Sequence, residues 1–464
     1  MGSHQDLHLL RVTSGLSSKA PPESPIHPNA HPSAPPTYPT RASGESSYLT
    51  CITHSPVQEG NAMIAITLLV GILFWIGVDI WAGTSSRWYS AVKLNPNMYS
   101  DDFSVLVPIY GKVNYLQNVG FLQDYGRRVV LCTTSGESAD FYQKLEAIAE
   151  RYGFRIFKST YTSRSSGRKR STSGVTRDTI VRDALNLVDL NSYTICLDAD
   201  TTTEEPLETI IGSFAHSGGD FASVRIVTQT DGPAIVQMQR HEYIISMRVR
   251  KIMPWLLSGA FHIGKTNVMR QIMQRHSLFF QGNDVETGII GDAMGFKAVH
   301  ILATVNTNVP DTFRGWWRQR IAWSGGAFRL FIVNFRFIFR HPFLWAYSGV
   351  VVILMFVLRW FAILTPGWTL LLALFIYYIA MIWLHWDDGS KWLIFQPVYS
   401  LFVSLIVVPI GILYYFVMAI PERNFGFIRV KRKAQALTSS PQSFSTNLDR
   451  NVDIVNTSHV LSQL

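Results

Sequence analysis

Four long apolar runs constrain this chain more than any other feature of its sequence. The runs occupy residues 62–83, 343–364, 367–386 and 392–420. A helix that spans the hydrocarbon core of a bilayer needs about 20 mostly apolar residues, and each run is long enough. Core helices of a soluble protein are the alternative, but four such runs in one chain are difficult to bury. The sequence therefore predicts an integral membrane protein with one span before residue 100 and about three spans after residue 342.

The charge content agrees with this prediction and helps to decide between nucleic acid and lipid as a partner. Charged residues make up 16% of the 464 residues, against about 25% in an average soluble domain. The net charge of +9 would suit either nucleic acid or anionic lipid headgroups. Lys and Arg lie in loops and beside the predicted spans, which favours lipid. We therefore expect the lipid bilayer as a partner and no nucleic acid.

The two tails differ in composition from the rest of the chain. Residues 1–60 are rich in Ser, Pro, His and Thr and show no apolar period. Such a segment buries too little apolar surface to offset its ordering entropy, so we predict a disordered leader. Residues 421–464 are first basic and then polar, and we expect them to be mostly disordered.

Residues 100–312 alternate short apolar runs with helical stretches, which predicts an α/β domain with a mostly parallel sheet. The expected strands occupy 103–111, 127–135, 151–160, 192–200 and 219–229, and the expected helices 114–126, 139–153 and 176–189. Ligands of such sheets bind beyond the carboxyl ends of the strands. Residues 313–341 mix aromatic residues and Arg without acids, which predicts an amphipathic helix in the headgroup plane.

Two carboxylates follow one of these expected strands, at Asp198 and Asp200. Alternation along a strand would place both on one face. Such a pair can hold Mg²⁺ or Mn²⁺, which then clamps a diphosphate. An acidic turn or a helix cap is the structural alternative.

Three further segments each have a functional and a purely structural interpretation. Asp284, in an acidic turn before a helix, could act as a general base or cap the helix. The loop with Ser258 and Gly259 could admit a bulky ligand close to the backbone, or it could be an ordinary turn. The basic loop 164–178 could reach phosphates or lipid headgroups, or it could be solvated.

Taken together in this order, the pieces resemble the membrane-embedded family-2 glycosyltransferases, a group that includes cellulose, chitin and hyaluronan synthases. The resemblance covers about residues 62–430. It implies a GT-A-like nucleotide-sugar-binding domain inserted between transmembrane helices.

The resemblance also implies roles for individual residues. Asp284 would be the catalytic base, and Asp198 and Asp200 would bind the metal ion and the donor diphosphate. The Trp323 ring would stack on the acceptor sugar. The remaining substrate-binding positions that it implies are Pro108, Tyr110, Ser258, Gly259, Gln319 and Arg320.

This sequence departs from the family pattern at several positions. Ala322 stands where the Gln-x-x-Arg-Trp motif has Arg, and Asn283 replaces Glu before the base. No acid directly follows the first expected strand, and only Glu137 follows the second. An inactive scaffold subunit of a synthase therefore stays an alternative.

The function that the resemblance implies is a metal-dependent, inverting transfer of a sugar from a UDP-sugar to a growing polysaccharide. The catalytic domain would be cytosolic at the plasma membrane, and an oligomer or accessory subunits are compatible with it. A single transfer to a lipid acceptor is the alternative enzyme. One feature conflicts with this layout: three spans after the domain place the basic segment 422–433 outside, whereas basic segments stay inside.

Overall fold

The computed structural model describes residues 91–161, 173–229, 231–338 and 391–430, together with isolated helical positions between 63 and 77 and at 375 and 379. The predicted leader, the spans predicted at 343–364 and 367–386, and residues 431–464 lie outside the described residues. The same holds for the span predicted at 62–83, apart from its isolated positions.

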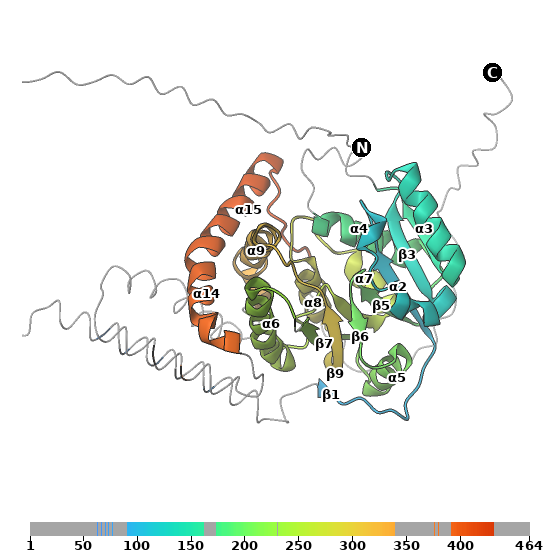
Figure 1. The fold of residues 1–464 in the computed structure, drawn as a ribbon, viewed down its shortest axis with the longest axis horizontal. Helices are drawn as coiled ribbons and strands as arrows, with labels where there is room; N and C mark the ends of the chain where they lie inside the picture. Colours follow the sequence, from blue (N-terminus) through green and yellow to red (C-terminus); the bar gives the residue numbers. More distant parts are fainter. Residues whose placement is uncertain are drawn as a thin grey trace, which may run out of the picture. The chain divides into compact units, whose positions relative to one another are not determined.

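The described strands form one mixed sheet in the order β1-β9-β7-β8-β5-β2-β3-β4, with β6 paired to β9 (Figure 1). Strands β5, β2, β3 and β4 pair in parallel, as predicted. Strand β8 runs antiparallel between β5 and β7, and β6 runs antiparallel to β9, so the sheet is mixed. The other strand pairs are parallel, which agrees with the predicted mostly parallel sheet. The strands are β1 (Ala91–Val92), β2 (Phe103–Pro108), β3 (Val129–Thr134), β4 (Arg155–Ser159), β5 (Tyr193–Leu197), β6 (Thr202–Thr203), β7 (Phe221–Thr228), β8 (Phe261–Lys265) and β9 (Ala298–Thr307).

The five expected strands correspond to β2, β3, β4, β5 and β7. The expected helices at 139–153 and 176–189 correspond to α3 and α4, whereas 114–126 forms only short helical pieces. The helical elements are η2 (Val113–Tyr115), α2 (Val119–Leu122), η3 (Gln123–Arg128), α3 (Ala139–Tyr152), α4 (Ser173–Leu187), α5 (Leu207–Ser217), α6 (Ala234–Ile252), α7 (Thr266–Met273) and α8 (Asn283–Ala293).

Alternation along β2 builds a core on each face of the sheet. Val105 and Val107 belong to a buried cluster with residues of α3 and α5, whereas Leu106 belongs to a second cluster with residues of α4, α7 and α8. Cys132 and Cys196 are buried free thiols in the second cluster. Burial raises the pKa of both thiols, which leaves them unreactive.

A helical layer follows the sheet domain and packs on it (Figure 1). Gly325 and Gly411 allow its α9 and α15 to approach closely, because a Cβ on Gly325 would lie 2.6 Å from the Gly411 carbonyl oxygen. The layer comprises α9 (Phe313–Phe328), η4 (Arg329–Val333), α10 (Phe335–Ile338), η7 (Lys391–Phe395), α14 (Gln396–Phe402), η8 (Val403–Val407) and α15 (Val408–Glu422).

Within the described residues, one helix is long and apolar enough to cross a membrane, at Val398–Glu422. It overlaps the span predicted at 392–420. Length and composition alone do not separate a membrane span from a core helix.

Candidate active site

The Asp198-Ala199-Asp200 segment lies in a turn just beyond β5, which ends at Leu197. Alternation had predicted both carboxylates on one face of a strand. This prediction is wrong, because both residues follow the end of the strand. Asn118 holds the turn, because its side-chain amide donates to the carbonyl oxygens of Asp198 at 3.0 Å and Thr201 at 2.7 Å. No sequence pattern indicates this role of Asn118, which is buried.

Arg177 of α4 is the cation that faces this turn. Its Nε lies 2.9 Å from Asp198 Oδ1, and its Nη2 donates to the Gly259 carbonyl oxygen. Burial raises the pKa of Asp198 to about 6, against the opposing effect of Arg177. Burial also raises the pKa of Asp200, while a hydrogen bond from Thr201 opposes it. Both carboxylates therefore sit where a further positive charge would stabilise their ionised forms.

Gly259 connects this turn to Asp284. The Gly259 N–H donates to Asp284 Oδ2 at 2.8 Å, while its carbonyl accepts from Arg177. A Cβ at Gly259 would lie 3.2 Å from Arg177 Nη1 and 3.7 Å from Asp284 Oδ2, so the position has little room for a side chain. The structure thus brings together Asp198, the loop after Ser258, and Asp284, three segments that are far apart in the sequence.

Asp284 does not cap its helix. Helix α8 begins after Gly282, which has φ of +87° and provides no side-chain cap. The Asp284 carboxylate instead faces Gly259. Behind it, Glu286 is fully buried and paired with Arg329 at 2.7 Å. The first turn of α8 therefore carries one carboxylate toward the candidate site and one into the protein.

A further carboxylate lies at the carboxyl ends of β2 and β3. Glu137 accepts from the Gly111 N–H at 3.0 Å and from the Thr134 hydroxyl at 2.7 Å. Pro108 is buried at the end of β2. Burial raises the pKa of Tyr110 to about 12, and Arg177 opposes this shift. Pro108 and Tyr110, which the resemblance implied as substrate-binding positions, thus lie at the same edge of the sheet as Glu137.

Helix α9 contributes Gln319, Arg320 and Trp323. The Arg320 guanidinium is buried and pairs with Glu242 of α6, with its Nε at 2.9 Å, and its Nη1 donates to Gln319 at 2.6 Å. It also lies 4.4 Å from the centre of the Trp323 ring. Trp323 is 39% exposed and lies 6.2 Å from the ring of Tyr243. Arg320 therefore supports the Trp323 ring from within the protein.

The sequence alone did not identify Asn118, Arg177, Glu242 or Tyr243 as residues around the site. Arg177 lies at the end of the basic stretch 164–178, whose composition indicates its charge but not its position in the fold. Burial raises the pKa of Tyr243, and Asp198 is among the charges that act on it.

No metal centre is complete within the described part of the chain, where no three His, Cys, Asp or Glu side chains form a group suited to hold an ion. Asp198 and Asp200 nevertheless suit Mg²⁺ or Mn²⁺. Hard ions of this kind often take one or two carboxylates from the protein and the remaining oxygens from substrate phosphates and water.

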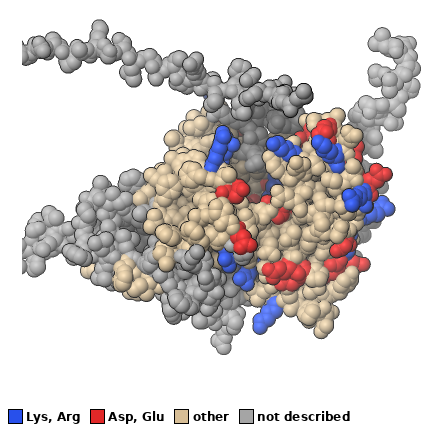
Figure 2. Space-filling model, in the orientation of Figure 1, with Lys and Arg blue, Asp and Glu red and all other residues tan. Residues whose placement is uncertain are grey.

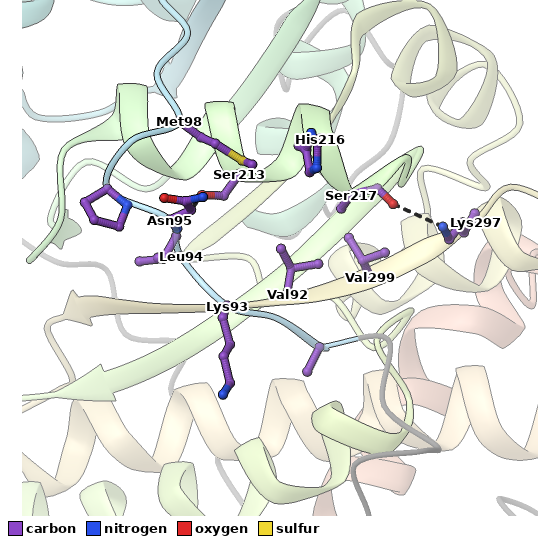
Figure 3. A pocket seen from close by; sticks show the side chains of 12 residues that line it. Val92, Lys93, Leu94, Asn95, Met98, Ser213, His216, Ser217, Lys297 and Val299 are labelled. Carbon is purple, nitrogen blue, oxygen red and sulfur yellow. Dashed lines mark hydrogen bonds between the residues drawn. The ribbon is translucent and has the colours of Figure 1, made fainter.

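A cavity of about 720 Å³ lies away from these residues, beside α5 and the start of β9. Figure 3 shows Lys93, Asn95, His216 and Lys297 around it, with Lys297 donating to the Ser217 carbonyl at 3.1 Å. None of the predicted site residues lines this cavity. We therefore place the candidate active site at the aspartate turn and not in this cavity.

Comparison with known proteins supports an enzyme that transfers glycosyl groups. Residues 193–386 match the family model described as glycosyl transferase family group 2. The matched segment includes Asp198, Asp200, Asp284 and Trp323. No curated protein sequence matches the chain.

Solved structures resemble the chain only distantly. A mannosyltransferase from Pyrobaculum calidifontis, in complex with GDP-Man and Mn²⁺, is 15% identical, with a TM-score of 0.48 over 76% of this chain and 98% of the other. Glucosyl-3-phosphoglycerate synthase from Mycobacterium tuberculosis, with Mn²⁺, UDP and phosphoglyceric acid, is 11% identical, with a TM-score of 0.30 over 49% and 76%. Residues 1–349 of TarS from S. aureus are 12% identical, with a TM-score of 0.34 over 69% and 90%.

Proposed function

We propose that this chain is a membrane-bound glycosyltransferase that transfers a sugar, with inversion, from a UDP-sugar to a growing polysaccharide. The observation that carries the proposal is the junction at Gly259, which places Asp284 on one side and Arg177 with Asp198 on the other. This arrangement gathers a candidate base and candidate diphosphate-binding groups at one site. The family match to residues 193–386 supports the same class of reaction.

The chemistry requires a base and a way to stabilise the departing diphosphate. Asp284 takes the proton from the acceptor hydroxyl as its oxygen attacks the anomeric carbon. The bond from that carbon to the diphosphate oxygen breaks, and the nucleotide leaves with the electron pair. Attack from the face opposite the leaving group inverts the anomeric centre. The Gly259 N–H fixes one oxygen of Asp284, which orients the carboxylate for this step.

The donor diphosphate is bound near Asp198 and Asp200. A Mg²⁺ or Mn²⁺ ion held by these carboxylates would neutralise the charge on the departing nucleotide. Arg177 lies beside Asp198, and its guanidinium can form forked hydrogen bonds with phosphate oxygens. The nucleotide base and the ribose of the donor bind toward Pro108 and Tyr110. Glu137 offers a carboxylate at this place.

The acceptor binds between the Ser258–Gly259 loop and Trp323. Sugars present apolar C–H faces that stack on aromatic rings, and Trp323 has an exposed ring supported by Arg320. Gln319 adjoins the same side of the site. We place the catalytic domain on the cytosolic side of the plasma membrane, where nucleotide sugars are available.

Replacement of the base tests the assignment. Asp284→Asn keeps the shape of the side chain but removes the base, so nucleotide release from a UDP-sugar by purified protein should fall by about 10² to 10⁴-fold. The matched control is Asp292→Asn on the same helix, which should retain activity. Undiminished turnover by Asp284→Asn would remove Asp284 from this role.

The products separate the two candidate reactions. A ladder of products from labelled donor supports a polymerase, and one product soluble in organic solvent supports the lipid-acceptor enzyme. Absence of turnover with every nucleotide sugar tested, in protein shown to be folded, would favour the scaffold alternative. Full activity after thorough chelation would remove the proposed metal role of Asp198 and Asp200.

A further inference from the structure

The last described helices form an apolar segment that could either cross a bilayer or lie on it. Elements η7, α14, η8 and α15 follow one another without a gap over residues 391–422, and we call them the C-terminal helix. The sequence has no Asp, Glu, Lys, Arg or His from residue 392 to 421. At about 1.5 Å per residue, this helix is long enough to cross a bilayer, as the span Val398–Glu422 indicates. Its contacts show whether it can do so.

The C-terminal helix is held on the catalytic domain near its beginning and in its middle. Near the beginning, the Tyr399 hydroxyl donates to Glu242 of α6 at 2.8 Å and accepts from Trp316 Nε1 at 2.8 Å. In the middle, Gly411 packs against α9, where a Cβ on it would lie 2.7 Å from the Ile321 carbonyl oxygen. Tyr415, one turn later, is fully buried.

The segment after the C-terminal helix also lies on this domain. The chain turns at Arg423, which has φ of +49°. The Asn334 side chain then donates to the Gly426 carbonyl at 3.1 Å and accepts from the Ile428 N–H at 2.9 Å. Ile428 is fully buried in the same core cluster as residues of α4 and α7. Both ends of the C-terminal helix are therefore on the side of the bilayer that holds the catalytic domain.

Helix α9, along which the C-terminal helix lies, is itself part of the catalytic domain. Arg320 is buried and pairs with Glu242. Gly326 packs against the backbone before α8, since a Cβ on it would lie 2.7 Å from the Gln281 carbonyl oxygen. A helix tied in this way to a polar domain cannot pass through hydrocarbon. The C-terminal helix, which packs beside it, follows the same surface.

The opposite face of the C-terminal helix is apolar and exposed. Six residues are 38% to 66% exposed and recur at helical spacing: Val398, Ile406, Ile410, Leu413, Val417 and Ile420. This spacing places them in one stripe along a helix. Phe402 lies at the edge of this face, where its ring packs against Trp316 of α9. In the face shown in Figure 2, the surface over α14 and α15 is mostly neutral, whereas charged side chains gather over β3 and α3. A long exposed stripe of this kind indicates contact with a membrane or a partner.

The position of the remaining apolar runs favours a membrane. The chain leaves the described helical layer after Ile338 and returns to it at Lys391. Between these points lie the runs 343–364 and 367–386, each long enough to cross a bilayer once. Two crossings return the chain to the side from which it left, which is the side that the contacts require. A bilayer crossed by these two runs would lie next to the helical layer that the chain leaves and re-enters.

We infer that the C-terminal helix lies on the bilayer instead of crossing it, with its apolar stripe at the boundary of headgroups and acyl chains. The chain crosses twice after residue 338, and not three times as the sequence had suggested. The basic segment 422–433 then remains on the side of the catalytic domain, which removes its conflict with the charge rule. This inference rests on the membrane association in the proposed function but not on the transfer reaction.

Depth measurements test the orientation of the C-terminal helix. Single cysteines replace Val398, Ile410 and Val417 in the full chain carrying Cys51→Ser, and each is labelled with an environment-sensitive fluorophore. The protein is reconstituted in vesicles of phosphatidylcholine and phosphatidylserine with spin labels placed at a shallow or a deep position of the acyl chain. We expect stronger quenching by the shallow label, to the same extent at all three positions.

Two outcomes would overturn the inference. Depth that changes along the helix, with the Ile410→Cys label nearest the bilayer centre, would show a crossing helix. Labels that neither spin label quenches would show that protein covers the stripe, for example the runs between residues 343 and 386. A label on Lys144→Cys, in the exposed part of α3, is the matched control and should not be quenched.

Sidedness gives a second measurement that does not depend on the stripe variants. A thiol reagent that cannot cross the bilayer should modify Arg429→Cys and Lys144→Cys to the same extent in intact vesicles. Complementary protection of the two positions would show an odd number of crossings between them and refute the inference. Neither measurement uses sugar transfer, so failure of the proposed reaction would leave both results interpretable.

Discussion

Replacement of Glu286 by Gln should destabilise the catalytic domain, because it removes the charge that balances a buried guanidinium. Glu286 and Arg329 both have side chains with 0% exposure, and their closest atoms are 2.7 Å apart. Glu286 also accepts from the N–H and the hydroxyl of Ser277, at 2.7 and 2.9 Å. The pair joins α8, which carries Asp284, to η4 at the end of α9.

The expected size of the effect follows from these contacts. Removal of one partner of a buried ion pair costs about 3–5 kcal/mol, because the other charge is left uncompensated. Arg329 keeps hydrogen bonds to the Ser277 hydroxyl at 2.6 Å and the Gln281 carbonyl at 3.2 Å. We therefore expect the lower end, about 3 kcal/mol. For a domain of this size, that loss lowers the melting temperature by about 6–12 °C.

The pH of the measurement matters for this comparison. Burial would raise the pKa of Glu286, but Arg329, His276 and the Ser277 N–H outweigh it and hold the pKa below its ordinary value. A lowered carboxyl pKa contributes stability that is complete above the unfolded value, about 4.3. That stability is lost as the pH falls through the folded value. Thermal unfolding followed by Trp fluorescence at pH 7.5 therefore measures the whole effect.

An exposed ion pair provides the control. Glu146 pairs with Lys158 at 2.8 Å, but both side chains are about half exposed, at 55% and 44%. Such surface pairs contribute about 0–1 kcal/mol, so Glu146→Gln should leave the melting temperature nearly unchanged. Equal small shifts for Glu286→Gln and Glu146→Gln would refute the reasoning. A double variant with Arg329→Gln should lose less stability than the sum of the two single changes.

Three further predictions concern the site and its surroundings. Arg177→Lys removes the forked donor beside Asp198, so the KM for the nucleotide sugar should rise about 10-fold or more. The melting temperature should change little. An unchanged KM would exclude phosphate binding by Arg177. Asn118→Leu removes two hydrogen bonds to the aspartate turn and should lower kcat, as measured by nucleotide release, whereas Asn186→Leu, at an exposed position of α4, should not. Burial lowers the pKa of His262 to about 4. The stability that the neutral imidazole provides should therefore be complete above about pH 6.5 and fall by about 3 kcal/mol toward pH 4. A melting temperature that falls as steeply with pH in His262→Gln as in the parent protein would contradict this.

The sequence predicted the elements whose pattern is local. Strands β2, β3, β4, β5 and β7 and helix α3 each carry their own apolar period and end signals. Helix α3, for example, begins where the Ser138 hydroxyl accepts from the Phe141 N–H at 3.2 Å, and it ends at Gly153 with φ of +70°. The antiparallel position of β8 between β5 and β7 depends on pairing between distant segments, which no local period reveals.

The candidate site was predictable in its acids but not in their partners. Asp198 follows an expected strand, so its position at the carboxyl edge of the sheet could be expected. Asp284 was predicted as an acid in a turn before a helix, without a position relative to the sheet. Arg177 is one of many basic residues in a Ser- and Gly-rich stretch, and only the packing of α4 against the aspartate turn distinguishes it. Asn118 acts through its contacts with the carbonyl oxygens of Asp198 and Thr201, which no sequence pattern specifies.

Ala322 stands where the Gln-x-x-Arg-Trp motif on α9 has Arg, and the structure shows which other guanidinium lies at the site. The motif lacks its Arg at this position, and Arg320 is the nearest guanidinium on the Trp323 side. Arg320 does not replace it as a phosphate ligand, because Glu242 already neutralises it and only 2% of its side chain is exposed. Among the described residues, Arg177 is the guanidinium that pairs with Asp198, and it reaches the site from α4. We therefore expect Ala322→Arg to change activity less than Arg177→Lys does, and the reverse order of effects would restore α9 as the source of the cation.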